Sequence, residues 1–453
     1  MASNPGDHSE TPPPSPLTWI GSDRRLARRI GRPVLRFLRI EAASGLLMLL
    51  AALFALVWAN SPWRDSYLDL LHSHIRFELG SALVLDEPLE AWINDALMVI
   101  FFFVVGLEIK RELVVGELRR PRAAALPAIA ALGGMVVPAL IYIAFNAGGE
   151  GAAGWGIPMA TDIAFAVGVL SLMGRRVSNS LKIFLLTLAI VDDIGAIAVI
   201  AVFYTDDLSL DWLLVAFLIV ALLVFMRLTR IWYTPAYLLV GVVLWLAVFE
   251  SGVHATIAGV ILGIIAPARP LVNESTFDGM VVRWFEGGSL SPPAARRASF
   301  EVRERVSVAD RLANLLHPWT SFVIIPIFAL ANAGVELSSN SVEAALSSPV
   351  TIGIVLGLVI GKLVGVGSFT WLAVRLRLCE LPQGATWSKI LGIGGVAGIG
   401  FTVSLFITNL AFEPRDIIDQ AKIGILVAST IAALVGAAIL RSSRPAETAA
   451  AAQ

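Results

Sequence analysis

The sequence predicts an all-α polytopic membrane protein with about twelve transmembrane helices. Of its 453 residues, 57% are hydrophobic and only 15% are charged, whereas soluble domains carry roughly a quarter charged residues. Apolar segments recur along the chain, and basic residues gather in alternate loops between them. We place these segments at 41–60, 91–110, 123–145, 156–173, 180–204, 209–226, 235–250, 253–267, 318–336, 350–374, 387–412 and 417–440.

The distribution of Lys and Arg tests this count. If both termini are cytoplasmic, the inside segments carry 29 of the 34 basic residues and the outside loops carry 3. This bias agrees with the positive-inside rule. We therefore expect a membrane domain over 33–441, with cytoplasmic tails at 1–32 and 442–453. The first tail is polar and Pro-rich, which is typical of disorder.

Two loops are long. Within the outside loop 61–90, a Gly-Ser turn between two β-prone runs predicts a hairpin at 74–85. An open strand edge outside the bilayer favours pairing with a second copy of the chain. The cytoplasmic loop 268–316 shows no clear element before Val306. It is either a regulatory segment or a tolerated insertion.

Two adjacent aspartates, Asp192 and Asp193, lie in the middle of the segment at 180–204. A charge at the centre of such a helix costs about 2.5 to 3.5 kcal/mol on insertion scales. Successive helical residues point about 100° apart, so one partner can hardly satisfy both carboxylates. Intramembrane carboxylates of this kind are candidates for an ion or proton site.

Two further segments carry signs of interrupted helices. Asp162 and Thr161 follow Gly154, Gly156 and Pro158. A break there would free backbone groups at membrane depth, which is tolerated only where they are buried or line a cavity. The alternative is a short span that starts at Pro158 and leaves Asp162 at the interface.

The eleventh segment has five glycines between Gly392 and Gly400. They indicate either close helix packing or a second interruption. Paired broken segments in corresponding halves are the best sequence sign of a transporter site. In the tenth segment, Lys362 lies too deep for an ordinary snorkelling lysine, although that alternative stays open. Its natural partner is Asp192 or Asp193.

Other polar residues lie nearer the segment ends. Asp95 begins the second segment, and Glu108, Arg111 and Glu112 form a charged patch at its inner end. His254 lies at the outer boundary of the eighth segment. For each of these residues, simple solvation at the membrane surface is an equal alternative to a functional role.

Several classes of site are not indicated. A single Cys379 excludes an internal disulfide, and the five histidines show no metal-ligand spacing. The net charge is −1, and nothing points to a nucleic-acid partner or to a cofactor.

Six motifs, in order along the chain, resemble the bacterial Na+/H+ antiporter A family, NhaA. This family is itself an example behind the rule of paired broken helices, so the two indications are not independent. The motifs are Trp92–Leu113, Ala160–Ala166, Leu188–Ile197, Ser251–Gly259, His317–Val335 and Gly398–Phe412.

The resemblance implies two inverted repeats, spans 3–5 and 10–12, with discontinuous spans 4 and 11. It implies that Asp192 and Asp193 bind the transported Na+ and protons, with Asp193 the foremost direct ligand. Lys362 would pair with Asp192, and Asp162 and Thr161 would occupy the helix crossing.

The activity implied is that of a secondary transporter, not an enzyme. It would exchange cytoplasmic Na+, and also Li+, for external H+, with more than one proton per Na+, in sodium and pH homeostasis. The expected setting is the lipid bilayer of the cell inner membrane, with the protein a homodimer joined through the hairpin.

The chain departs from the family pattern at two places. Leu363 follows Lys362 where many members have Pro, which alters the stiffness of the backbone. Ala313 and Asn314 stand where some members have an acidic residue and a histidine linked to pH sensing. We therefore expect the pH response to involve other groups, among them Glu108 and Glu112.

Two rival functions use similar features. An intramembrane aspartyl protease needs two facing aspartates, such as Asp162 and Asp193, but its Tyr-Asp and Gly-x-Gly-Asp motifs are absent and it has no use for Lys362. A sodium-coupled symporter for an organic solute would need room and polar groups for that solute. The exchange hypothesis needs only competition between protons and Na+ for one set of carboxylates.

Overall fold

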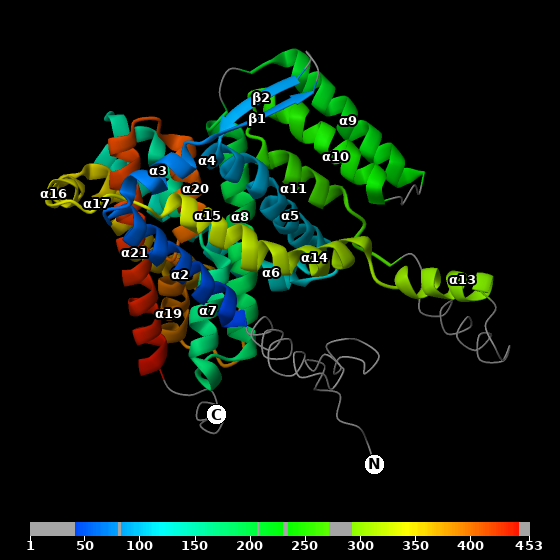
Figure 1. Cartoon of the computed structure of the whole chain (residues 1–453). Coiled ribbons are helices and arrows are strands. Elements are labelled where there is room, and N and C mark those ends of the chain that lie inside the picture. The colour runs from blue at the N-terminus through cyan, green and yellow to red at the C-terminus, as the bar shows by residue number, and fades with distance from the viewer. Residues whose placement is uncertain (1–40, 80–82, 206–207, 230–233, 271–291, 444–453) are drawn as a thin grey trace, which may run out of the picture.

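The computed structural model is mostly helical and describes residues 41–79, 83–205, 208–229, 234–270 and 292–443. Its helices form one bundle, with a two-stranded sheet at one end (Figure 1). Each of the twelve predicted apolar segments contains an apolar helix or a pair of helices. The expected tail at 1–32 and most of the tail at 442–453 lie outside the described residues.

The regular elements follow the order of the predicted segments. They are α2 (Glu41–Ala59), α3 (Arg64–Leu71), β1 (His74–Leu79), β2 (Leu83–Pro88), α4 (Leu89–Ala91), η2 (Trp92–Leu97), α5 (Met98–Val114), η3 (Glu117–Arg119), α6 (Pro121–Asn146), η4 (Glu150–Met159), α7 (Ile163–Leu172), η5 (Gly174–Arg176), α8 (Asn179–Phe203), α9 (Leu210–Leu228), α10 (Thr234–Phe249), α11 (Thr256–Ile265), α13 (Pro292–Arg303), α14 (Val308–Trp319), η6 (Thr320–Ile324), α15 (Ile325–Asn332), α16 (Ser339–Ser347), α17 (Pro349–Leu356), η7 (Gly357–Gly361), α18 (Lys362–Arg375), α19 (Trp387–Ala397), α20 (Phe401–Ala411) and α21 (Arg415–Ser442).

The helices make this a multi-pass membrane protein. Among the described residues, seven helices are long and apolar enough to cross a membrane, and three bent pairs raise that number to ten. Two shorter apolar helices, α10 and α11, complete the set. With 10 residues, α11 is about 15 Å long, or half the thickness of a hydrocarbon core.

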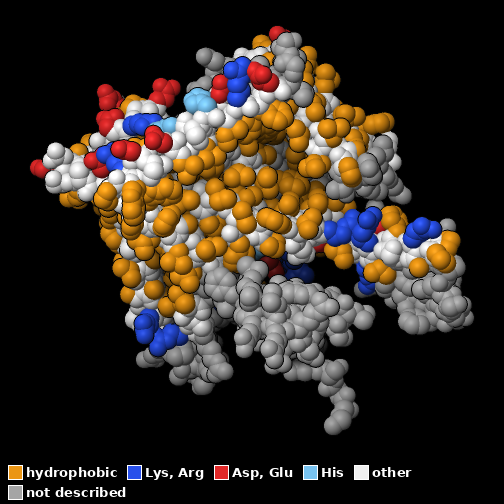
Figure 2. Space-filling view, in the orientation of Figure 1, with side chains coloured by type: hydrophobic (Ala, Val, Ile, Leu, Met, Phe, Trp, Pro, Cys, Tyr) orange, Lys and Arg blue, Asp and Glu red, His pale blue; other side chains and the backbone are white. Residues whose placement is uncertain are grey.

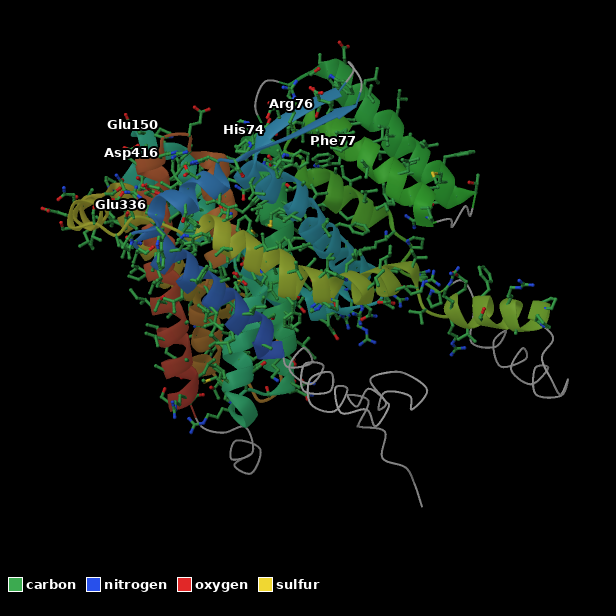
Figure 3. All side chains as sticks on the ribbon, viewed as in Figure 1. His74, Arg76, Phe77, Glu150, Glu336 and Asp416 are labelled. Atoms are coloured by element: carbon green, nitrogen blue, oxygen red, sulfur yellow. The ribbon has the colours of Figure 1, made fainter. Side chains whose placement is uncertain are left out.

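The surface is divided into an apolar belt and two polar rims. Hydrophobic side chains cover the middle of the visible face, and acidic side chains gather at the hairpin end (Figure 2). Glu150, Glu336 and Asp416 lie at this end beside the hairpin residues His74 and Arg76 (Figure 3). Lys and Arg gather away from the hairpin, where α21 ends and along α13.

The predicted hairpin is confirmed. Strands β1 and β2 pair in antiparallel register from His74 opposite Pro88 to Leu79 opposite Leu83. The second strand ends three residues later than predicted, and the turn itself lies outside the described residues. The Trp92 indole donates to the carbonyl of Ile75 at 3.1 Å, which fixes the first strand against the start of the following helix.

The prediction of no element before Val306 is wrong, because α13 forms in that loop. Two prolines in its first turn and the Ala and Arg residues that follow favour a helix. Glu304, which is buried, accepts hydrogen bonds from Arg311 at 2.9 Å and from Arg303 at 3.3 Å. These ion pairs join the end of α13 to α14.

The ninth helix also begins ten residues before the predicted start at 318. Ser307 caps it by accepting a hydrogen bond from the Asp310 amide at 3.0 Å. Proline cannot continue the hydrogen-bond ladder, so a helix often ends beside one. The helix instead passes through Pro318 and relaxes into the π-helical turn η6 directly after it.

Two glycines bring α6 and α18 into backbone contact. A Cβ atom on Gly365 would lie 2.1 Å from the carbonyl oxygen of Gly133, and one on Gly133 would lie 2.3 Å from the carbonyl oxygen of Gly365. Lys362 is on the same helix, one turn earlier, and packs against Gly134. This close approach therefore sets the depth at which Lys362 enters the core.

We predict that Gly365→Ala lowers the free energy of unfolding by about 1–3 kcal/mol. The added methyl group would meet backbone atoms of α6, which cannot move aside as a side chain can. Thermal unfolding of the purified protein in detergent measures this. Gly149→Ala is the matched control, since its nearest atom would be 3.8 Å away. Equal melting temperatures for the two variants would contradict the close crossing.

Candidate functional site

Two broken helices meet in the core. The pair η4 and α7 is bent by 45°, and the pair α19 and α20 by 46°. The linking residues 160–162 and 398–400 run side by side, and the Asp162 amide donates to the carbonyl of Ile399 at 2.7 Å. Both links are buried, as non-helical backbone at membrane depth must be. The interruptions predicted in the fourth and eleventh segments are therefore present.

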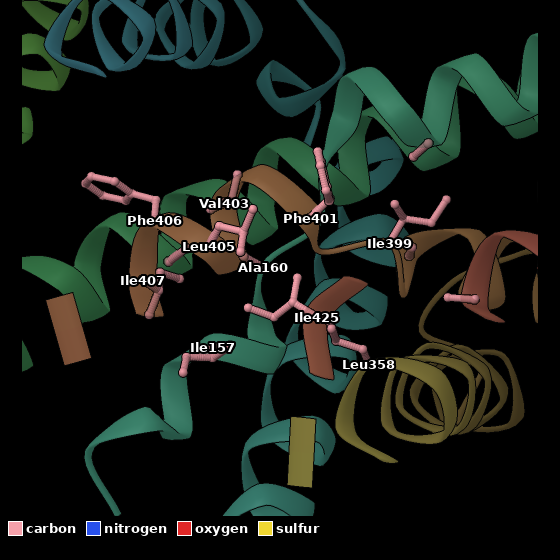
Figure 4. Packing of buried hydrophobic residues seen from close by; sticks show 14 of the residues in the cluster. Ile157, Ala160, Leu358, Ile399, Phe401, Val403, Leu405, Phe406, Ile407 and Ile425 are labelled. Carbon is pink, nitrogen blue, oxygen red and sulfur yellow. The ribbon is translucent and has the colours of Figure 1, made fainter. Parts of the chain in front are cut away.

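The glycines of the eleventh segment allow both close helix packing and the interruption of the helix. Gly398 lies in the break, where a Cβ atom would be 2.3 Å from the carbonyl oxygen of Leu358. Gly395 lies inside α19 and packs against Gly436 of α21. Close packing and interruption thus occur together, and the apolar side chains around the crossing fill the space between the helices (Figure 4).

Asp162 joins the two broken helices. Its Oδ1 accepts from the Phe165 amide at 3.0 Å and so caps α7. Its Oδ2 accepts from the Thr402 amide at 3.2 Å and from the Thr402 hydroxyl at 2.6 Å, which caps α20. A carboxylate here opposes the positive ends of two helix dipoles. Asp162 is buried, so its alternative placement at the membrane interface is excluded.

Lys362, Asp192 and Thr161 form a buried polar cluster beside this crossing. The Lys362 ammonium makes an ion pair with Asp192 Oδ2, and neither side chain is exposed. Thr161 Oγ1 lies 3.0 Å from Lys362 Nζ, 2.7 Å from Asp192 Oδ2 and 2.8 Å from the carbonyl oxygen of Ala397. Having one proton, the hydroxyl accepts from Lys362 and donates to either oxygen.

Of the two partners predicted for Lys362, the contact is therefore with Asp192, and the snorkelling alternative is excluded. Asp193 is the next residue on α8 and is almost buried. Within the described ranges, no residue donates a hydrogen bond to its carboxylate, and Asp192 Oδ1 is likewise buried without a partner. The unused acceptors of the cluster are thus on the two adjacent aspartates.

In the described part of the chain, no three His, Cys, Asp or Glu side chains are grouped as a metal site would require. A cation at Asp193 and Asp192 would therefore take its further ligands from neutral oxygens. The Thr161 hydroxyl is joined to Asp192, and the Ala397 carbonyl is joined to the same hydroxyl. Hard cations such as Na+ prefer oxygen ligands of these kinds.

Glu108 is close enough for its charge to act on Asp193, and the other accessory residues make their contacts outside this cluster. His254 Nε2 is 3.7 Å from Asp95 Oδ1, so these two predicted residues are brought together near the hairpin end. At the other end of α5, Arg111 pairs with Asp310 of α14 at 3.4 Å, and Glu112 accepts from the Glu117 amide at 3.0 Å. The predicted patch is therefore tied to neighbouring segments as well as through its own charges.

A polar cavity of about 590 Å³ opens on the side opposite the hairpin. Its lining includes Glu112, Glu117 and Arg120 at the mouth and Thr187 and Ile190 of α8. Thr187 precedes Asp193 by six residues, or about 9 Å along the helix. The cavity therefore approaches the aspartates along α8.

Thr402 was not singled out by the sequence, although it follows the glycine run directly. Its role depends on contact with Asp162, 240 residues earlier. The same holds for Ser404, whose hydroxyl donates to the carbonyl of Ile157 at 2.8 Å. A Ser or Thr two to four residues after a glycine-rich break is a usable sequence signal. Its hydroxyl can bond to the polar groups that the break leaves without helical partners.

A membrane protein in which two discontinuous helices cross beside buried carboxylates has the architecture of a secondary transporter. Comparison with known proteins gives the family. The family model of Na+/H+ antiporter 1 matches residues 35–440, and the chain belongs to this family.

Curated relatives match over nearly their whole length. The chain is 46% identical to "Na(+)/H(+) antiporter NhaA 2" of Sorangium cellulosum, over 95% of this chain and 94% of the relative. It is 45% identical to "Na(+)/H(+) antiporter NhaA" of Rhodopirellula baltica, over 98% and 99%. These matches confirm the resemblance drawn from the motifs.

We predict that Asp192→Asn destabilises the protein, because it leaves the Lys362 ammonium buried without its counter-charge. Breaking a buried pair costs about 3–5 kcal/mol. The melting temperature in detergent should fall, and adding Lys362→Met should recover part of the loss. If the double variant is no more stable than Asp192→Asn alone, the ion pair does not carry this energy.

Proposed function

We propose that this protein is an electrogenic secondary transporter that exchanges cytoplasmic Na+, and also Li+, for external H+. The observation that carries the proposal is the pair of adjacent aspartates beside the helix crossing. One is held by Lys362, and the other has no hydrogen-bond donor in the described part of the chain. Its relatives bear the name of a Na+/H+ antiporter. The role in the cell would be sodium and pH homeostasis.

The mechanism rests on competition for the same oxygens. A carboxylate in a dry site must be neutralised, either by a proton or by a cation. Na+ bound between Asp193 and Asp192 would release the protons held there, and protons arriving from the other side would release Na+. Because the protein changes access only when loaded, the two fluxes are coupled.

The cluster also accounts for the proposed excess of protons over Na+. Asp193 is one proton-binding group, and the Asp192–Lys362 pair is a second. Such groups titrate as a coupled set. Thr161 can turn its single proton between Asp192 and the Ala397 carbonyl, so the broken helix would sense the charge on Asp192.

The finer topology belongs to this proposal. Twelve spans would arise if α10 and α11 each count as one. One repeat would comprise α6, the broken pair η4–α7, and α8, and the other would comprise α17–α18, the broken pair α19–α20, and α21. The nearly equal bends of the two pairs support this. The concentration of Lys and Arg opposite the hairpin supports cytoplasmic termini and the inner membrane of a bacterium.

The accessory residues take a regulatory place in the same scheme. Glu112 lies at the mouth of the cavity, and Glu108 and Arg111 lie within one turn of it. Asp95 and His254 form a second titratable pair near the hairpin. Because Ala313 and Asn314 cannot titrate, we assign the pH response to these five residues.

The rival functions fit less well. A protease would need two aspartates free to share a water molecule, but Asp162 is engaged by three donors from two helices. A symporter for an organic solute would need space at the crossing. Buried side chains such as Ile157, Leu358 and Ile399 occupy that region (Figure 4).

We predict that Asp193→Asn abolishes exchange. The amide keeps the shape of the carboxylate but can neither bind a proton nor neutralise Na+. The test uses proteoliposomes with an acidic interior and a pH dye, to which Na+ alone is added. Asp211→Asn, on an exposed face of α9, is the control and should exchange normally. Sodium-driven proton flux at the wild-type rate in Asp193→Asn would overturn the proposed function.

The proposed homodimer joins through the hairpin, whose two strands leave an open edge at the polar rim. Removing residues 75–85 should therefore shift the purified protein from dimer to monomer in mild detergent, while exchange in vesicles persists. Light scattering coupled to size-exclusion chromatography measures the mass. A deletion variant that stays fully dimeric would place the interface elsewhere.

A further inference from the structure

The hairpin side of the crossing is closed by residues that the exchange mechanism does not use. Asn409 is near the end of α20, six residues before Arg415, which donates to His72 beside β1 at 2.6 Å. Asn332 ends α15, four residues before Glu336, which pairs with Arg64 at 2.6 Å. Both helix ends therefore face the hairpin.

An aromatic layer lies just beyond the crossing. The ring of Phe406, on α20, packs at 5.2 Å from Phe102 of α5, 5.2 Å from His254 and 6.3 Å from Phe328 of α15. Phe406 is buried. This layer joins the broken helix pair to elements that are not part of either break.

A chain of three amide side chains forms a second layer, nearer the hairpin. Asn409 donates to Asn332 Oδ1 at 2.5 Å, and Asn332 donates to Asn94 Oδ1 at 2.9 Å. Asn332 also donates to the carbonyl of Phe328 at 3.0 Å, so both of its amide protons and its oxygen are used. It is fully buried, in a place where apolar packing alone would have served.

We propose that Asn409, Asn332 and Asn94 form a lock that holds the site closed towards the hairpin. The inference rests on the proposed function, in which access must alternate. Opening on this side requires α20 to part from α15, and the Asn409–Asn332 bond crosses that boundary. Asn94, on η2, accepts from Asn332 and so holds it in place to receive Asn409. Their bonds are neutral, so the lock holds without a charge that would compete with Asp193 for protons or Na+.

The lock can be tested by measuring how fast a cysteine at one buried position reacts with a reagent from outside the cell. Cys379 is the only cysteine, so Cys379→Ser gives a background for Val403→Cys, on α20 one turn before Phe406. Intact cells are treated with a membrane-impermeant maleimide, and the labelling rate is measured. Losing one inter-helix hydrogen bond shifts an equilibrium about five-fold. We expect Asn409→Ala to raise the labelling rate about five-fold.

Thr408→Val is the matched control, because the Thr408 hydroxyl is buried but bonds only within its own helix, to the Ser404 carbonyl at 2.9 Å. It should leave the rate unchanged. Asn94 is the half-buried outer member of the three amides. Asn94→Ala should raise the labelling rate of Val403→Cys as Asn409→Ala does. It serves as the second variant if Asn409→Ala does not fold.

Glu343 is exposed on α16 at the hairpin end. Labelling of Glu343→Cys separates a failure of the proposed function, which sets the orientation, from a failure of the lock. If it is not labelled from outside, the orientation in the proposed function is wrong. If it is labelled but Asn409→Ala and Asn94→Ala leave the Val403→Cys rate unchanged, the lock is wrong. A rise as large in Thr408→Val would show general loosening and would equally overturn the lock.

Discussion

The crossing depends on Asp162, because a broken helix inside a membrane leaves backbone amides that water cannot satisfy. One carboxylate accepts from three donors and caps two half-helices that are distant in the sequence. The backbone bond from Asp162 to Ile399 closes the junction. Without such a junction, two interrupted helices would each expose unsatisfied groups, at several kcal/mol per group.

The geometry of this junction decides what the neighbouring aspartates can do. Because Asp162 is committed to the helix ends, the carboxylate oxygens without a donor among the described residues are on Asp192 and Asp193. Lys362 divides their roles, since it reaches Asp192 and leaves Asp193 without a donor among the described residues. The Gly133–Gly365 contact brings α18 close enough for this. A structural carboxylate, a paired carboxylate and an available carboxylate thus lie within one cluster.

The sequence predicted the parts of this arrangement that are local. Apolar runs, the positions of Asp192, Asp193, Asp162 and Lys362, both helix breaks and the hairpin follow from composition, spacing and turn residues. The contact of Lys362 with one of the two aspartates could be predicted from charge alone. The contact of Thr402 with Asp162 could not, because nothing near Thr402 in the sequence indicates it. The ninth helix was placed too late because its first turns carry Asp310, Arg311 and Asn314 and so lie outside the apolar run.

The two faces of the site are built unequally, and this bears on how access could alternate. Opposite the hairpin, a polar cavity extends along α8 towards Asp193. Towards the hairpin, an aromatic layer and an amide layer join α20 to α5 and α15. Closure on that side thus combines apolar packing, which is non-directional, with the hydrogen bonds of the three amides. These bonds form only when the helices are in one relative position. A rigid half-helix that pivots at the Asp162 junction would break the Asn409–Asn332 bond and the contacts of Phe406 together. The amide layer would therefore make the change of access all-or-none, which tight coupling between Na+ and protons requires.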